Sequence, residues 1–157
     1  MGRLHDAATA FLDDEGWAYE VQPAPPGRDG QRIHFRFTSE TTQYDCWIVC
    51  YEETERLCVL ALLPIVVPEP MRLPIAEYIT RANYGIMVGN FELDFQDGEV
   101  RMKTSADVED TPISHTFVRN LLVANLGTAD RYFPGFVKVL YSNMEPADAI
   151  AVVRELQ

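Results

Sequence analysis

The sequence predicts a single α+β domain, in which helices pack on an antiparallel sheet of about five to six strands. Three observations support this fold class. Short alternating or apolar runs follow one another between residues 17 and 63, stretches with helical spacing lie on either side of them, and residues 91–104 have the pattern of a complete β-hairpin. One domain over residues 1–157 is long enough to bury roughly two-thirds of its unfolded surface.

The hairpin prediction rests on Asp97-Gly98, because these two residue types tolerate the positive φ of a two-residue type I′ turn. Folding about that turn predicts three pairs on one face, Phe95–Val100, Leu93–Met102 and Phe91–Thr104. It predicts two pairs of opposite charge on the other face, Asp94–Arg101 and Glu92–Lys103. A single register therefore matches both apolar and charged partners.

Four further strands are expected at residues 17–21, 33–38, 44–51 and 56–63. The last two differ from the others, because Cys46–Tyr51 and Leu57–Leu63 are apolar at nearly every position. A strand that is apolar on both faces is normally covered on both faces, and helices occupy only one side of an antiparallel sheet. We therefore expect a symmetric homodimer, with cover by the last helices of the chain as the alternative.

Helices are expected at residues 4–14, 71–83 and 113–126, with a last helix from about Pro146. Residues 127–130 (Gly-Thr-Ala-Asp) predict an interruption, after which Tyr132 to Leu140 continue in helical spacing. Pro134 would either kink this segment or lie in the first turn of a new helix.

The composition excludes several function classes. The net charge is −11, with 24 acidic and 13 basic residues, so nucleic acid and anionic lipid are not expected partners. The negative charge is interpreted as serving solubility, and the alternative interpretation is that the partners are basic or apolar protein segments. The longest apolar run, Val59–Val67, is too short to span a bilayer and contains Pro64. Because no apolar signal-peptide core follows Met1, we expect a cytoplasmic protein.

The cysteines and histidines predict no catalytic or metal site. Cys46 and Cys50 share one face of a strand about 13 Å apart, too far for a disulfide or a shared zinc ion. Cys58, placed opposite Val49, points to the other face. Buried, reduced thiols are the expectation. The alternative is a nucleophilic thiol, in which Cys50 or Cys58 meets a histidine in space.

The acidic clusters also predict no site. Residues 13–15, Glu92 with Asp94, and residues 107–110 are each interpreted as solvated surface and not as paired catalytic carboxylates or a calcium site. We therefore expect no catalytic residue, no cofactor and no metal, and a protein that is not an enzyme.

Two stretches resemble the YbjN-like family of bacterial proteins. The first is residues 82–105, with Asn83, Gly89-Asn90-Phe91-Glu92, Asp97-Gly98 and Thr104-Ser105; the second is residues 121–135, with Asn125, Asp130-Arg-Tyr132 and Pro134. Pro146 and Ala149-Ile150 are similar to the closing helix of that family. The resemblance covers about Gln31 to Val153. It implies a fold like that of type III secretion chaperones, a dimer, and a sensory-regulation role without established catalytic residues.

Taken with the resemblance, the residues predict a non-catalytic protein that binds another protein, as a chaperone, adaptor or regulator. The alternative is a small-ligand-binding regulatory module with a pocket between the sheet and the helices.

Overall fold

The computed structural model describes residues 2–27 and 29–155, and it confirms the expected fold class. Six strands form one antiparallel sheet in the order β1-β2-β3-β4-β6-β5. The strands are β1 (Tyr19–Gln22), β2 (Gln31–Thr38), β3 (Gln43–Tyr51), β4 (Arg56–Val66), β5 (Asn90–Leu93) and β6 (Glu99–Asp107). The helices are α1 (Arg3–Asp14), a short 3₁₀ turn η1 (Glu69–Met71), α2 (Arg72–Asn83), α3 (His115–Tyr141) and α4 (Pro146–Glu155).

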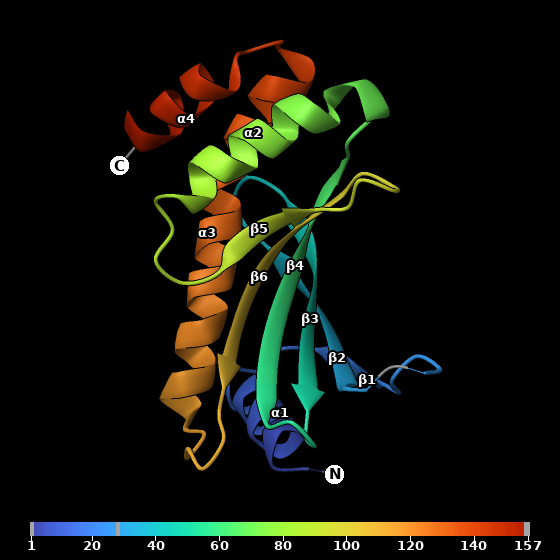
Figure 1. Ribbon diagram of the computed structural model, residues 1–157. Helices are drawn as coiled ribbons and strands as arrows, with labels where there is room; N and C mark the ends of the chain where they lie inside the picture. The colour runs from blue at the N-terminus through green and yellow to red at the C-terminus, as the bar shows by residue number, and fades with distance from the viewer. Residues whose placement is uncertain (1, 28, 156–157) are drawn as a thin grey trace.

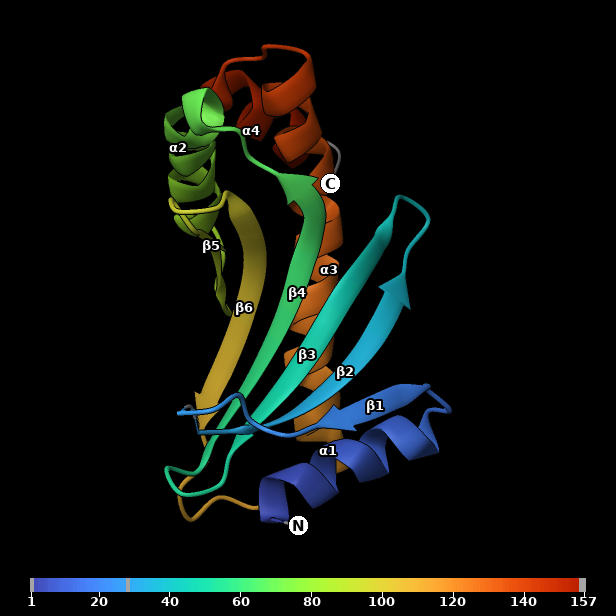
Figure 2. The same ribbon diagram turned by 90° about the vertical axis from the view of Figure 1, so that its right-hand side faces the viewer.

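The helices cover one face of the sheet and its two ends. Helix α3 runs along the sheet, α1 lies at one end, and α2 and α4 lie together at the other (Figure 1). The core fills the space between α3 and the sheet, where Phe35, Tyr44, Ile48, Met102 and Phe136 are almost completely buried. The opposite face, turned toward the viewer in Figure 2, carries none of the described helices. We call it the open face.

Helix α1 takes its N-terminal cap from a distant part of the chain. Its own N-cap residue, Gly2, has no side chain to offer, and the Glu52 carboxylate accepts hydrogen bonds from the backbone N–H groups of Leu4 (3.1 Å) and His5 (2.8 Å). Glu52 lies in the turn between β3 and β4. A carboxylate at this position satisfies two otherwise free N–H groups and complements the positive end of the helix dipole.

Helix α3 corrects the prediction of an interruption at residues 127–130, because it is a single helix of 27 residues that contains Pro134. Its buried face continues without a break through Asn125, Ala129, Tyr132 and Phe136. Burial of this continuous stripe outweighs the low helix propensity of Gly127, which lies on the exposed side. The Ser114 hydroxyl caps the helix by accepting a hydrogen bond from the N–H of Phe117 (3.1 Å).

Strand β4 is longer than predicted, because it continues past Pro64 to Val66. Proline cannot donate to a strand ladder, and the pairing of β4 with β6 is irregular between Leu62 and Val66. The irregularity therefore accommodates Pro64 near the end of the strand. Strand β1 begins at Tyr19, two residues later than the predicted start.

The predicted hairpin exists between β5 and β6, but its register is wrong by two residues. Leu93 pairs with Val100, Phe91 with Met102 and Glu92 with Arg101, and the turn is a longer loop over residues 94–98. Because the shift is even, each side chain keeps its predicted face, although Phe95 moves into the loop and is exposed.

Local and tertiary hydrogen bonds account for the longer loop. The N–H of Gly98 (φ +83°) donates to the Asp94 carbonyl (2.9 Å), and the Asp94 carboxylate accepts from the N–H of Gln96 (2.7 Å). The Gly98 carbonyl accepts in turn from the N–H of Val67 (2.9 Å), just after β4. These contacts favour the longer loop over the two-residue turn that Asp-Gly alone predicts.

Candidate binding surface on the open sheet face

An apolar stripe runs down the middle of the open face, on strands β3 and β4. Trp47 lies opposite Leu60 and Val49 opposite Cys58, with Leu62 next along β4. Trp47, Leu60 and Leu62 are half-buried, whereas Val49 and Cys58 are almost fully buried. The stripe is therefore accessible along its middle and upper part.

Basic residues flank the stripe on both sides. On β2 the side chains directed to this face are Arg32, His34 and Arg36, and on β6 they are Arg101 and Lys103. The register places His34 beside Trp47, Trp47 beside Leu60 and Leu60 beside Lys103. We call Arg32, His34 and Arg36 the β2 column, and Arg101 and Lys103 the β6 column.

Among the described residues, two carboxylates form ion pairs with the columns. Asp45 lies 3.1 Å from His34 Nε2 and 3.3 Å from Arg36 Nε. Glu92 contacts Lys103 and lies 2.7 Å from Arg101 Nε. Partial burial alone would raise the pKa of Glu92, but the hydrogen bonds from Lys103 and Arg101 outweigh it and lower the pKa below its usual value.

Arg32 differs from the other basic residues of the columns. Among the described residues, no carboxylate lies within 4.0 Å of it, and its Nε is buried without a hydrogen-bond partner. A buried N–H group that loses water without gaining a partner costs about 1–3 kcal/mol. Arg32 therefore carries a buried N–H group without a partner on this face.

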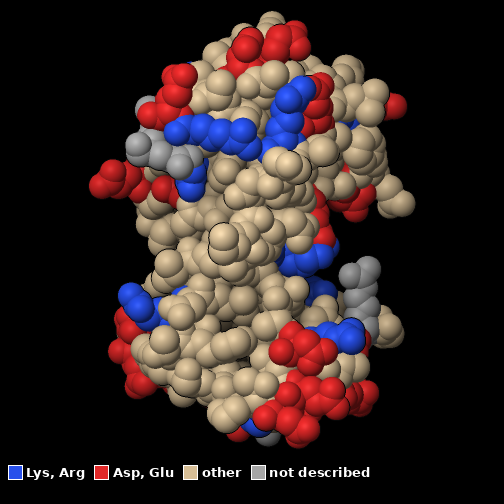
Figure 3. Space-filling view, turned by 60° about the vertical axis from the view of Figure 1, so that its left-hand side comes forward, with Lys and Arg blue, Asp and Glu red and all other residues tan. Residues whose placement is uncertain are grey.

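The charge of the open face differs from that of the whole chain. Its strands carry five Lys and Arg residues and five Asp and Glu residues, so the face is neutral although the chain has a net charge of −11. The basic residues are Arg32, Arg36, Arg56, Arg101 and Lys103, and the acidic residues are Glu20, Asp45, Glu92, Glu99 and Asp107. The excess negative charge lies elsewhere. Figure 3 shows the side of α3, where charged residues gather toward the two ends and the waist has few.

Two loops frame the open face. In Figure 1 it is turned to the right, with the hairpin loop 94–98 above it and the connection between β1 and β2 below. Hollows of about 540 and 320 Å³ lie at its upper part, the first lined by Glu92, Phe95 and Arg101 and the second by Asp45, Leu62 and Val66. The upper part of the face therefore contains two hollows, each lined by both apolar and charged side chains.

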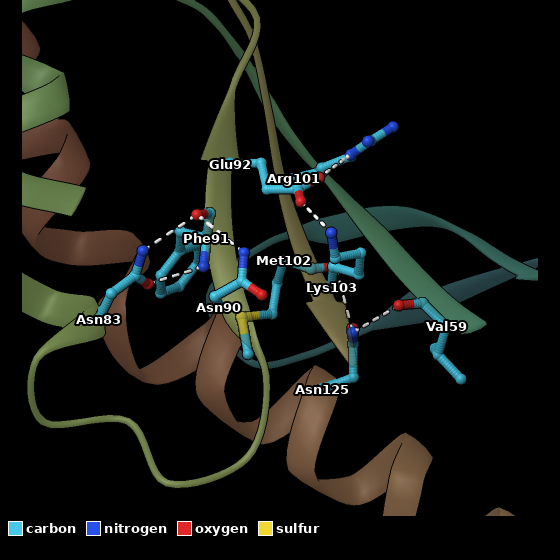
Figure 4. Close-up of polar contacts among 9 residues, drawn as sticks. All are labelled: Val59, Asn83, Asn90, Phe91, Glu92, Arg101, Met102, Lys103 and Asn125. Atoms are coloured by element: carbon cyan, nitrogen blue, oxygen red, sulfur yellow. Dashed lines mark hydrogen bonds and ion pairs between the residues drawn. The ribbon is translucent and has the colours of Figure 1, made fainter. Parts of the chain in front are cut away.

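The edge of the sheet at β5 is closed by Asn83, at the end of α2. Its amide donates to the Phe91 carbonyl (3.1 Å) and accepts from the Phe91 N–H (2.8 Å), as a neighbouring strand would (Figure 4). Gly89, with φ +85°, lets the chain enter β5 against β6, because a Cβ there would overlap the carbonyl of Lys103. These two residues build this edge of the sheet.

Asn125, on α3, joins the helix to the sheet. Its buried amide donates to the carbonyls of Val59 on β4 (3.0 Å) and Met102 on β6 (3.1 Å) (Figure 4). Thr104 completes this contact by donating to the Leu121 carbonyl (3.1 Å). Buried polar groups that find such partners fix the position of a helix on a sheet.

Asp130 holds the turn between β2 and β3 against α3. Its carboxylate accepts hydrogen bonds from the Ser39 hydroxyl (2.5 Å) and the Tyr44 hydroxyl (3.1 Å). Burial and the nearby carboxylate raise the pKa of Tyr44. Two residues further along α3, the backbone carbonyl of Tyr132 accepts a hydrogen bond from the buried Tyr78 hydroxyl (2.9 Å). The residues that carry the family resemblance therefore hold the fold together.

The three thiols are free and buried, and their faces are as predicted. Cys46 and Cys50 point into the core, where burial raises the pKa of each to about 12, and Cys58 points to the open face. Such thiols are protonated at neutral pH, and the thiolate is the reactive form. Over residues 2–27 and 29–155, no three His, Cys, Asp or Glu side chains are grouped so that they could hold a metal ion.

The histidines lie on separate elements. His5 is buried in α1, His34 lies on the open face against the Trp47 ring (4.5 Å between centroids), and His115 begins α3 beside Phe11. None of the described helices is long and apolar enough to cross a membrane.

The family model for YbjN, described as "Putative bacterial sensory transduction regulator", matches residues 6–138. The chain belongs to the YbjN family. Two solved structures share the fold of this YbjN-family chain. YbjN from E. coli has a TM-score of 0.56 and 18% identity over 80% of this chain and 90% of its own. The HopA1–SchA chaperone–effector complex contains a chain with a TM-score of 0.53 and 15% identity, over 83% of this chain and 92% of its own.

At such identities the structural likeness shows the fold alone, including the expected likeness to a type III secretion chaperone fold. No curated protein sequence matches this YbjN-family chain. The sequence reasoning did not find the two basic columns. Their signal was present, since His34 and Arg36 alternate with apolar residues on β2, and Arg101 and Lys103 do so on β6. However, the strand order of the folded sheet is needed to place the two columns on either side of the same stripe.

Proposed function

We propose that this YbjN-family protein binds a segment of another protein on its open face, in a regulatory, adaptor or chaperone-like role. The observation that carries this proposal is the accessible apolar stripe around Trp47, Leu60 and Leu62, which has basic residues on either side. A partly exposed apolar surface with a polar border is the usual form of a protein-binding site. A chain of a chaperone–effector complex has the same fold, and this likeness supports a protein-binding role.

The proposed role is non-catalytic. The thiols are buried with raised pKa values, and the histidines lie on separate elements, so neither set forms a nucleophile with a base. We place the protein in the cytoplasm, where buried, unpaired cysteines such as Cys46 and Cys50 remain reduced. The acidic surface opposes direct binding of nucleic acid.

Site-specific photo-crosslinking tests the proposal. A photo-reactive amino acid at Leu62, on the open face, should capture a partner protein in cells, identified by mass spectrometry. The same amino acid at Val123, which is exposed on α3, is the matched control. The proposal fails if the two positions give the same captured proteins, or if Leu62 captures none.

A second copy of the chain is the competing occupant of the open face. A face with five positive and five negative residues can pair with itself, and a symmetric dimer would cover the apolar stripe. Light scattering at micromolar concentration should then give twice the monomer mass, and Leu62→Glu should restore the monomer. A monomer mass for the unmodified protein would show that the stripe is not covered by a second copy of the chain.

A small ligand is the second candidate, favoured by one hollow. This hollow, of about 580 Å³, lies at the edge between β1 and β2 and is lined by Trp17, Tyr19, Phe35 and Phe37 among others. It differs from the pocket between sheet and helices that the sequence led us to expect. Native mass spectrometry of the purified protein would reveal a co-purifying metabolite, and Trp17→Ala should remove it.

A further inference from the structure

We propose that the upper end of β4 pairs with an extended segment of a partner protein, in which a lysine or arginine lies beside Val66 and reaches Glu99. This inference rests on the proposed function and specifies the form and the charge of the partner. The site adjoins the apolar stripe, because Leu62 belongs to the stripe and also lines the hollow of about 320 Å³ at this end of β4.

Strand β4 continues beyond its neighbour β3. The last pair between the two strands is Asp45 with Leu62, whereas β4 runs on to Val66. Figure 2 shows the upper ends of the two strands diverging, and Asp130 holds the turn between β2 and β3 against α3. The residues of β4 after Leu62 extend over about 13 Å. This length of β4 therefore has no strand beside it where β3 would continue.

The backbone of Val66 is free to pair with a new strand. The N–H of Val67 donates to the Gly98 carbonyl (2.9 Å), so the polar groups of Val67 face β6. Backbone groups alternate between the two sides of a strand, and those of Val66 therefore face the β3 side. Among the described residues, neither the N–H nor the carbonyl of Val66 has a hydrogen-bond partner. An extended segment can satisfy both groups by adding a strand at this edge.

The charges at this end of β4 favour a basic partner residue. Asp97 and Glu99 line the hollow together with Asp45, and no Lys or Arg lines it. Asp45 already has basic partners, whereas Asp97 and Glu99 form no ion pair within the part of the chain that the structure describes. The neighbouring Arg101 directs its Nε to Glu92 (2.7 Å). A cation from outside would therefore find two carboxylates without an ionic partner.

The register places that cation. Val66 lies opposite Glu99, and its side chain is 71% exposed. A partner residue paired with Val66 on its other side shares the same face of the sheet. The apolar stem of a lysine or arginine there can cover Val66, while its charged end reaches the Glu99 carboxylate. A glutamate at the same position would meet like charge.

Peptide titration followed by NMR tests this inference. The probe is a peptide of about eight residues, with alternating valine and threonine and a central arginine. One matched peptide has glutamate in place of the arginine. A second carries a methyl group on the backbone nitrogen of the arginine, which removes the donor to the Val66 carbonyl. Chemical-shift changes of the isotope-labelled protein measure the three affinities under one salt condition and locate the site.

The arginine peptide should shift the amide signal of Val66 and bind about fivefold or more tightly than either matched peptide. Val66→Pro removes the free N–H and should weaken binding about fivefold or more, whereas Val66→Thr, which keeps the N–H, should leave binding unchanged. Glu99→Gln should weaken binding of the arginine peptide about threefold or more and should not weaken binding of the glutamate peptide. Thermal unfolding of each variant checks that the fold is intact.

Equal or tighter binding of the glutamate peptide would overturn the basic partner. Equal binding of the methylated peptide would overturn the strand pairing, as would shifts at Val21, on the outer strand β1, in place of Val66. Absence of binding by all three peptides also overturns the inference. If crosslinking from Leu62 still captures a partner in that case, the proposed function stands and only the form of the partner is wrong. If crosslinking from Leu62 fails as well, both proposals fail.

Discussion

Replacing Asn83 with alanine should destabilise the protein far more than the same change at Asn90. Asn83 makes two hydrogen bonds to the backbone of Phe91, at 2.8 and 3.1 Å, and Phe91 is buried. Two such bonds contribute about 2 kcal/mol, and groups left unpaired in a buried place add to the loss. We therefore expect the free energy of unfolding to fall by about 2–3 kcal/mol for Asn83→Ala.

Asn90→Ala is the matched control, because Asn90 makes one longer bond, 3.3 Å, to the same carbonyl. Its loss should cost about 0.5 kcal/mol or less. Urea unfolding followed by circular dichroism gives both free energies, provided that the slope with denaturant is unchanged. Equal losses for the two variants, within about 0.5 kcal/mol, would refute the argument that Asn83 replaces a missing strand.

The other predictions concern glycines, an ion pair and thiols. Gly89→Ala should lower the stability of the fold by about 2 kcal/mol or more, because Gly89 has a φ of +85° and a Cβ there would overlap β6. Gly127→Ala should instead stabilise α3 by about 0.5–1 kcal/mol, because a Cβ at this position meets no other atom. Thermal unfolding of the two variants compares these effects. Glu92→Gln should lower stability by about 1 kcal/mol at pH 7. The pKa of Glu92 is lowered in the folded protein, so this loss should persist above its usual value of 4.5 and fade as the pH falls through the lower folded value; a pH-independent loss would contradict the ion pair. Cys46 and Cys50 should resist iodoacetamide at pH 8 until the protein is unfolded, because burial raises the pKa of each to about 12; mass spectrometry of the alkylated protein checks this, and labelling of the folded protein would contradict it.

The parts of the fold that follow from local periodicity were predictable. The end of α2 at Asn83, the start of α4 at Pro146 and the opposite faces of Cys50 and Cys58 agree with the sequence reasoning. Period-2 and period-3.6 patterns identify such features, because each depends on neighbours in the chain.

The sequence predictions were wrong where contacts between residues distant in the chain outweigh the local conformational preference. Asp97-Gly98 favours a two-residue turn, yet the hydrogen bond between Val67 and Gly98 and the cap by Asp94 select a longer loop. Gly127 disfavours a helix, but α3 continues because its other side is buried along its whole length. The β2 and β6 columns were missed for a related reason, since their meeting on one face depends on strand order, which no short stretch of sequence encodes.

The carboxylate of Glu52, which caps α1, affects when this helix can be completed during synthesis of the chain. Glu52 follows Leu4 and His5 by 48 and 47 residues, so α1 is synthesised well before the group that completes its first turn. A helix of 12 residues is marginal in water on its own, even without a missing cap. Its apolar side needs more than this cap, because Phe11 lies against His115 at the start of α3 (4.7 Å between ring centroids). A chain stopped after Glu52 but before α3 could therefore cap α1 and would still keep that apolar surface exposed.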